Sequence, residues 1–245
     1  MKRGFGLICS FFMIAFSSIS VITSCSKTEE DDDYKVWEMD LAEESQRQGV
    51  SVSGNVAGYT YVDLGLSVKW ATYNIGVKSP TEFGNYFAWG ETSGKNNFSW
   101  DNYKLSNGSS SMKKYCSNDQ RTVLDSGDDA ATVNWGAAWR MPTSAEWKEL
   151  IRNCDWYFDT DFKGSGIAGA VGQSLENGNE IFIPAAGYYE NSLNTKQGRD
   201  IHYWSASLSS EEDKGVSFYL TPSNALDPNG RSYRFTGFPV RPVLK

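Results

Sequence analysis

The chain has 245 residues, a formal net charge of −7, 14% aromatic residues and a single histidine. The mildly acidic balance gives no support for a nucleic-acid partner or for binding to an anionic membrane surface. With one histidine, histidine-rich zinc sites and the HExxH motif are excluded.

Residues 1–25 are typical of a bacterial lipoprotein signal. A basic start, MKR, precedes the apolar stretch LICSFFMIAF, and no charge follows before Lys27. The tetrapeptide ITSC at 22–25 resembles a lipobox, which predicts lipidation of Cys25 and removal of the segment before it. An uncleaved membrane helix is the alternative; we do not favour it, because no Trp or Tyr belt and no basic stop flank its far end.

Residues 26–57 are interpreted as an acidic flexible tether. From residue 26 to 58, three basic side chains stand against nine acidic ones. The run SKTEEDDD directly after Cys25 also resembles the signal by which Bacteroidetes-type lipoproteins reach the outer face of the outer membrane, and both interpretations can hold together. We therefore expect an outer-membrane protein held by a lipid anchor, with its folded domain (58–245) facing the cell exterior.

Two cysteines remain after the signal segment and the lipidated residue, Cys116 and Cys154. In an exported chain this number favours one disulfide, which would stabilise the fold by about 3–4 kcal/mol on the chain-entropy model. Two free buried thiols are the alternative.

The first half of the domain predicts short strands and a long loop. The segment 59–76, YTYVDLGLSVKWATYNIG, alternates large and small residues and predicts two strands around Gly65. The segment 83–91 predicts a third strand that ends in a tight turn. The polar stretch 92–124 predicts a long surface loop.

Two helices are expected next. In the first, over 126–136, Ser126 is the expected N-cap, acidic residues occupy the first turn, and Gly136 ends the helix. The second begins at a capping box formed by Thr143 and Glu146. Its expected buried face carries residues at i, i+3, i+4 and i+7: Trp147, Leu150, Ile151 and Cys154.

The second half returns to strands. Asn177-Gly178 lies between two extended runs and predicts a hairpin. The segments HYWSASL, GVSFYLTP and YRFTGFPVRPVLK predict further strands. The expected architecture is an α+β domain over 58–245, with two helices packed on a twisted antiparallel sheet and long loops.

Several segments together resemble a known family. They are YVDLGLSVKWATYNIG, GNYFAWGET, DDAATVNWGAAWRMPTSAEWKEL, IFIPAAGYY, YWSAS and GFPVRPV. In this order, over 59–243, they are similar to the Fibrobacter succinogenes major paralogous domain, a group within the C-type-lectin-like superfamily. The resemblance implies a C-type-lectin-like fold with a long irregular loop region near its C-terminal end, and it implies no established activity.

Related domains use that loop region as a ligand face, which corresponds here to residues 203–235. The calcium-lectin tripeptides EPN, QPD and WND are absent, so the resemblance does not imply calcium-dependent sugar binding. Formylglycine-generating enzymes share the superfamily and use a reactive cysteine pair, but Cys116 and Cys154 lie outside such a motif.

Patterns for catalysis are weak. A Ser-His-Asp triad would need His202, and no GxSxG motif supports one. GSGIAG at 164–169 matches GxGxxG, yet a hairpin and not a helix is expected after it, so we interpret it as a turn cluster. DSGDDA at 125–130 lacks the spacing of an EF-hand loop. Paired carboxylates for glycoside hydrolysis stay open, but no pair stands out; we expect a non-catalytic protein without a cofactor or metal.

Binding is the function class that the sequence favours. Most tryptophans are expected in the core: Trp70, Trp89, Trp135, Trp139, Trp147 and Trp204. Arg140 and Arg241 are expected to be buried and paired with carboxylates. The candidate ligand-binding residues lie in the late segment and combine turn formers with side chains that stack and hydrogen-bond: Tyr219, Ser223, Asn224, Asn229, Arg231, Tyr233 and Arg234. An ordinary solvated hairpin is the alternative for this segment.

The sequence thus predicts a surface lipoprotein whose domain binds an extracellular ligand, foremost a glycan, as in adhesion. The alternative is an accessory subunit of a surface or fimbrial assembly that docks a protein partner, and a glycan hydrolase is a third hypothesis. A glycan site should show a shallow aromatic and polar cleft, whereas a docking site should show a broad apolar patch.

Overall fold

The computed structural model describes residues 41–108, 111–223 and 226–244. The predicted signal segment 1–25, the lipidation site Cys25 and the acidic run after it lie outside the described residues. Within the described ranges, no helix is long and apolar enough to cross a membrane.

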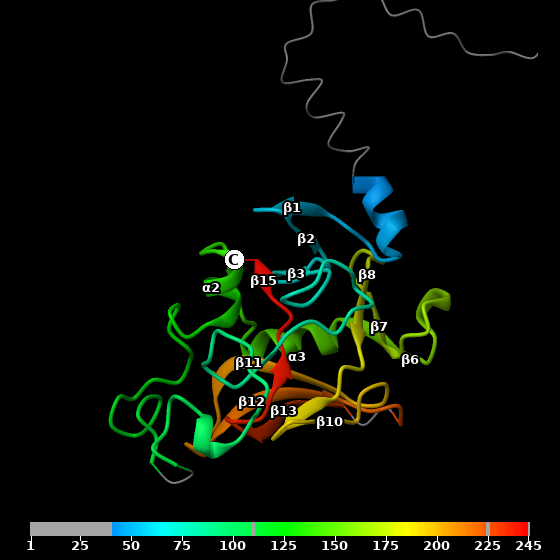
Figure 1. Ribbon diagram of the computed structural model, residues 1–245. Helices are drawn as coiled ribbons and strands as arrows, with labels where there is room; N and C mark the ends of the chain where they lie inside the picture. Colours follow the sequence, from blue (N-terminus) through cyan, green and yellow to red (C-terminus); the bar gives the residue numbers. More distant parts are fainter. Residues whose placement is uncertain (1–40, 109–110, 224–225, 245) are drawn as a thin grey trace, which may run out of the picture. The chain divides into compact units, whose positions relative to one another are not determined.

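A five-stranded sheet joins the two ends of the domain (Figure 1). Its strands are all antiparallel to their neighbours. In spatial order they are β1 (Gly54–Val56), β2 (Tyr59–Val62), β3 (Lys69–Ala71), β15 (Val243–Leu244) and β5 (Trp139–Arg140). Gly65 has a φ of 74° in the turn between β2 and β3, so the expectation of two strands around this glycine is confirmed.

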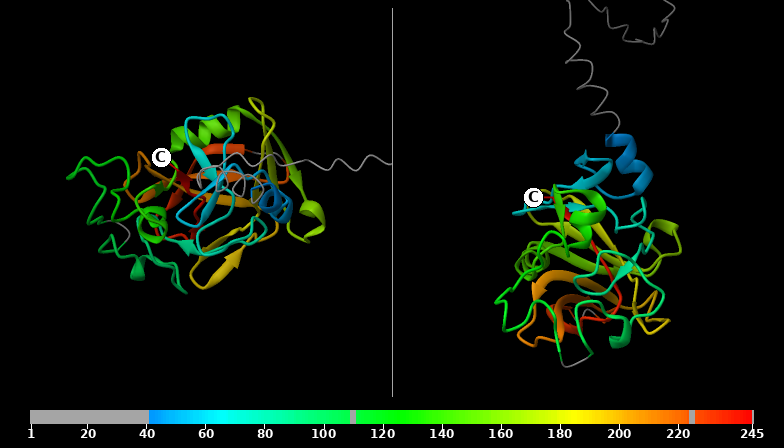
Figure 2. Two further views of the ribbon diagram at one scale, coloured as in Figure 1. Left: turned by 90° about the horizontal axis from the view of Figure 1, so that it is seen from above. Right: turned by 60° about the vertical axis from the view of Figure 1, so that its left-hand side comes forward.

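The folded domain begins earlier than residue 58. Residues 41–48 are helical, Val50 and Val52 are buried, and β1 pairs with β2 along its whole length. In Figure 1 and the right-hand view of Figure 2 the helical segment lies at the β1–β2 end of the domain. The tether boundary predicted at residue 57 is therefore wrong, because the segment before it supplies β2 with a partner strand.

Helix α3 (Ser144–Arg152) begins at the predicted capping box. The Thr143 hydroxyl accepts the Glu146 backbone N–H at 3.3 Å, and the Glu146 carboxylate accepts the Thr143 N–H at 2.7 Å. Trp147 and Leu150 are fully buried, while Ile151 is half-buried. Cys154, also buried, is the first residue of the following strand.

Helix α2 (Ala130–Trp135) is shorter than predicted. Its N-cap is Asp129 and not Ser126, whereas Gly136 is the expected C-terminal stop. The Asp129 carboxylate accepts the N–H of Thr132 at 2.9 Å and that of Met141 at 2.8 Å. It therefore caps the helix and holds the end of β5 at the same time, which Ser126 cannot do from three residues earlier.

A second sheet packs against α3. It consists of β11 (Ile201–Leu208), β12 (Lys214–Leu220) and β13 (Leu226–Tyr233), in that order. The Trp147 ring stacks on Phe218 of β12 at 4.5 Å and lies 4.7 Å from the Trp70 ring of β3. One tryptophan of α3 thus joins the two sheets in a common core.

The remaining elements form short ribbons and turns (Figures 1 and 2). A meander contains β6 (Cys154–Asp159), β7 (Gly169–Ser174) and β8 (Glu180–Pro184); the Asn177-Gly178 turn between β7 and β8 confirms the predicted hairpin. Two ribbons are β4 (Tyr86–Phe87) with β14 (Phe238–Pro239), and β9 (Tyr188–Glu190) with β10 (Leu193–Thr195). Short 3-10 turns are η1 (Trp100–Asn102) and η2 (Phe162–Gly164). The domain is thus mostly antiparallel β structure with few helices, an α+β arrangement.

Aromatic side chains fill the core. All six tryptophans expected there are buried: Trp70, Trp89, Trp135, Trp139, Trp147 and Trp204. The described parts of 92–124, residues 92–108 and 111–124, are mostly loop, as predicted, but they do not lie only at the surface. They bury Phe98, Tyr103 and Tyr115, so aromatic anchors fasten them to the domain.

The predicted Cys116–Cys154 disulfide is wrong, since both residues are free, buried thiols. Cys154 belongs to the core cluster around Trp147. Cys116 follows Tyr115, whose ring packs against Trp89 in a different cluster. The two sulfurs therefore lie in separate parts of the fold.

The two arginines next to prolines differ. Arg140 pairs with Glu146 at 2.7 Å, as expected. Arg241 is fully buried and has no carboxylate partner among the described residues. Its guanidinium donates to Asn74 Oδ1 at 2.8 Å and to the carbonyls of Ala71 and Thr72 at 3.1 and 2.8 Å. Burial lowers the pKa of Arg241 to about 10, and oriented dipoles replace the expected ion pair.

Candidate functional site

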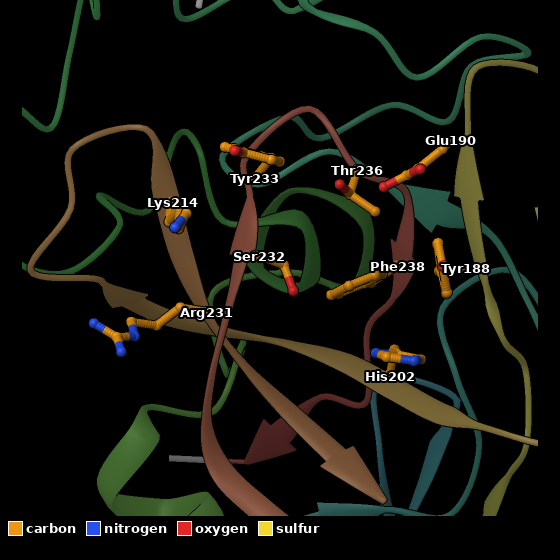
Figure 3. A pocket seen from close by; sticks show the side chains of 9 residues that line it. All are labelled: Tyr188, Glu190, His202, Lys214, Arg231, Ser232, Tyr233, Thr236 and Phe238. Carbon is orange, nitrogen blue, oxygen red and sulfur yellow. The ribbon is translucent and has the colours of Figure 1, made fainter. Parts of the chain in front are cut away.

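A pocket of about 320 Å³ opens between β9, β11, β13 and β14 (Figure 3). We call it the His202 pocket. It is lined by Tyr188, Glu190, His202, Lys214, Arg231, Ser232, Tyr233, Thr236 and Phe238.

Aromatic rings form one side of the pocket. The His202 ring lies 5.0 Å from Tyr188, 5.1 Å from Phe238 and 4.7 Å from Tyr219. The antiparallel register of β11 and β12 places His202 opposite Tyr219. Phe238 is buried, while Tyr188 and His202 are half-buried, so part of this aromatic surface is open to a ligand.

His202 carries an unpartnered polar atom. Its Nε2 is buried and has no hydrogen-bond partner among the described residues. Burial, with a smaller contribution from the positive charge of Lys196, lowers the pKa of His202 to about 4, so the ring is neutral at neutral pH. A buried polar group left without a partner costs about 1–3 kcal/mol. Because Nε2 is closed to solvent, a hydrogen bond from a ligand can recover this cost only when the His202 ring rotates to turn Nε2 toward the pocket.

Polar groups lie around the aromatic side. Glu190 is exposed and makes no ion pair or side-chain hydrogen bond within the described ranges. The Ser232 hydroxyl is 3.2 Å from that of Ser217. In Figure 3, Glu190, Thr236 and Ser232 border the same space as Tyr188, Phe238 and His202.

The two cations of the lining are already paired. Lys214 and Arg231 approach the carboxylate of Glu211 at 2.5 and 3.1 Å. Figure 3 shows their side chains on the other side of β13 from Phe238 and His202. The open space therefore faces Glu190, a carboxylate without an ion-pair partner among the described residues, while Lys214 and Arg231 are already paired with Glu211.

The late segment is more regular than predicted. Residues 203–235 were expected to contain a long irregular loop region, but most of them belong to β11, β12 and β13. Of the seven predicted ligand-binding residues, Arg231 and Tyr233 line the His202 pocket. Tyr219 contacts the His202 ring without lining the pocket.

Three predicted residues that the structure describes do not line the pocket. Ser223 is exposed in a turn, and Asn229 is exposed on β13. Asn224 lies outside the described residues. The assignment of Arg234 to a ligand face is wrong, because its side chain is fully buried. It donates to the carbonyls of Lys114 and Tyr115 and lies 4.8 Å over the Trp89 ring.

Most residues of the His202 pocket carry no local sequence signal for a binding site. Tyr188 and Glu190 lie two residues apart in GYYEN, a pattern that places both on one face of a strand. That strand pairs with β10, and Tyr189 bridges to Gly237. The Tyr189–Gly237 bridge brings Thr236 and Phe238 into the pocket lining, and local sequence patterns do not predict such a long-range contact.

The ionisable side chains suggest no metal centre. Among the residues that the structure describes, no three His, Cys, Asp or Glu side chains are grouped so as to hold a metal ion. Comparison with known proteins identifies no relative: no family model, curated protein or solved structure matches the chain.

Proposed function

We propose that this domain is a binding module that takes a hydroxyl-rich ligand, foremost one sugar residue of an extracellular glycan, in the His202 pocket. The observation that carries the proposal is the unpartnered His202 Nε2 beside an aromatic surface and the uncommitted Glu190 carboxylate. A sugar ring offers C–H groups to an aromatic face and hydroxyls to a carboxylate and an imidazole. A volume of about 320 Å³ is at the lower end for ligand pockets and suits a single ring.

The proposal includes the setting of the domain. The lipobox-like ITSC sequence and the acidic run after it support a lipid-anchored protein at the outer face of the outer membrane. The family resemblance in the sequence supports a C-type-lectin-like fold for the domain. Protease added to intact cells should then cleave the domain, and complete protection would contradict a surface location.

The other two hypotheses gain less support. A docking subunit should present a broad apolar patch, but the most exposed large apolar side chains of the described ranges, Leu175 and Leu193, lie on separate hairpins. A glycan hydrolase should present two facing carboxylates, and Glu190 is the single carboxylate among the residues lining the pocket.

A glycan array with the chain from residue 26 to 245, which retains every described residue, tests the proposal. Glu190→Gln and His202→Phe keep the size and shape of the two side chains and remove their hydrogen-bonding groups. Each should weaken binding about tenfold, the equivalent of one hydrogen bond to a charged or buried group. Glu176→Gln, at an exposed turn outside the pocket, is the control. Unchanged binding in both pocket variants refutes the site, and silence across the array favours a protein partner, to be sought by pull-down from cell envelopes.

A further inference from the structure

A second hollow lies on the opposite face of strand β9. Side chains alternate along a strand, so Tyr188 and Glu190 line the His202 pocket while Tyr189 lines another space. This space, which we call the Tyr189 groove, has a volume of about 820 Å³. It is bordered by the segments 84–86, 94–98 and the turn between β9 and β10.

The groove has an aromatic wall that is held in place. The Tyr189 ring lies 4.7 Å from Tyr86, nearly perpendicular to it, and 5.7 Å from Phe98. The backbone of Tyr189 makes two 2.9 Å hydrogen bonds with Gly237. Phe98 and Asn191 exchange two of 2.8 Å. Because these side chains are already held in place, stacking a ligand on this wall loses little side-chain conformational entropy.

Uncommitted polar side chains line the rest of the groove. Asn85, Asn96 and Ser192 are exposed, and their side chains make no hydrogen bond with the described part of the chain. Amide and hydroxyl groups both donate and accept, so they suit a ligand whose own groups do the same.

The single charged side chain of the lining is neutralised. Lys95 Nζ lies 3.0 Å from the buried carboxylate of Glu91, and it also donates to the Asn102 carbonyl at 3.2 Å. Burial lowers the pKa of Lys95, and its ammonium group is already bonded to Glu91 and to the Asn102 carbonyl. The groove therefore has no means to select an anionic ligand.

The groove continues beyond one ring-sized site. Asn85 also lines a neighbouring hollow of about 260 Å³. On that side Tyr59 stacks on Trp135 at 4.1 Å. The two hollows share Asn85 and each has aromatic side chains, so an extended molecule could contact both. The single charged side chain in the lining of the second hollow is the exposed Lys78.

An extended peptide would need free backbone groups to pair with, as in strand addition. Here the backbone N–H and C=O groups of Phe98, Asn191 and Tyr189 already form hydrogen bonds within the domain, and the Asn85 N–H donates to the Ile75 carbonyl at 2.8 Å. Recognition must therefore come from aromatic faces, amides and hydroxyls. We propose that the Tyr189 groove is a second binding site, which takes a strand of a neutral polysaccharide across several sugar residues.

The proposal is independent of the His202 pocket, and the test separates them. The chain from residue 26 to 245 is titrated calorimetrically with neutral glucans, xylan and mannan, and then with fragments of the polymer that binds, from disaccharide to hexasaccharide. Affinity should rise with fragment length. Tyr189→Ala should lower it about tenfold, as expected for the loss of one aromatic stacking surface.

Further variants protect the test from a folding artefact and from the first site. The double substitution Asn85→Ala and Asn96→Ala touches exposed side chains and should lower affinity for the polymer at least as much. Glu176→Gln, at an exposed turn outside both sites, should leave it unchanged, and Glu190→Gln reports whether the same polymer also enters the His202 pocket. The proposal is overturned if no neutral polymer binds, if a polyuronate or an unstructured peptide binds more tightly, or if only Glu190→Gln weakens binding.

Discussion

The buried histidine should make the stability of the domain depend on pH. The pKa of His202 falls from an ordinary value of 6.5 to about 4 in the folded protein, because burial disfavours the charged ring. Between these two values the unfolded chain binds a proton and the folded domain does not, so the free energy of unfolding decreases as pH falls. The stabilisation is complete above pH 6.5, and about 3 kcal/mol of it is lost by pH 4.

Urea denaturation of the wild type and of His202→Phe, measured from pH 7.5 to 4.5, isolates this effect. Carboxylates titrate alike in both proteins, and the chain has no second histidine. The wild type should therefore lose about 2 kcal/mol relative to the variant between pH 7 and pH 5. Parallel curves across this range would show that His202 is not held neutral by burial and would refute the reasoning.

Three other predictions concern the fold. Trp147→Ala should lower the free energy of unfolding by about 3–5 kcal/mol, since it removes a fully buried ring between two sheets; unchanged denaturation would contradict the core assignment. In the same assay, Thr143→Ala should lower the free energy of unfolding by about 1 kcal/mol, whereas Ser126→Ala should change it by no more than about 0.5 kcal/mol. A larger loss for Ser126→Ala than for Thr143→Ala would indicate that Ser126 caps a helix. A reductant should leave the melting temperature unchanged, and two thiols, Cys116 and Cys154, should react after denaturation; a mass two hydrogens lighter would reveal a disulfide.

The sequence predicts local structure correctly where the signal is complete within a few residues. The capping box of Thr143 and Glu146 forms with the backbone N–H groups of these two residues alone. The Asn177-Gly178 turn requires only one extended segment on either side. Ser126 failed as a cap because the choice depends on Met141, which reaches the Asp129 carboxylate from twelve residues away. Local patterns cannot rank two side chains that offer the same kind of acceptor.

The candidate site depends on contacts that are still more distant. β13 contains Pro228 and Gly230, which locally favour a loop, yet it pairs with β12 as an edge strand, where a residue without an N–H is tolerated. Once this strand forms, the Arg234 guanidinium lies over the Trp89 ring instead of at a ligand face. The pocket residues Tyr188 and Glu190 likewise owe their positions to pairing with β10, beyond the reach of composition or periodicity.

The position of β15 affects how the protein can be made. Val243 pairs with Trp70 on one side and Arg140 on the other, so the strand formed by residues 243–244 lies inside its sheet. During synthesis, the edge of β3 that pairs with β15 stays unpaired until the intervening chain has been translated. A nascent chain of this topology cannot close the five-stranded sheet before residues 243–244 have been translated.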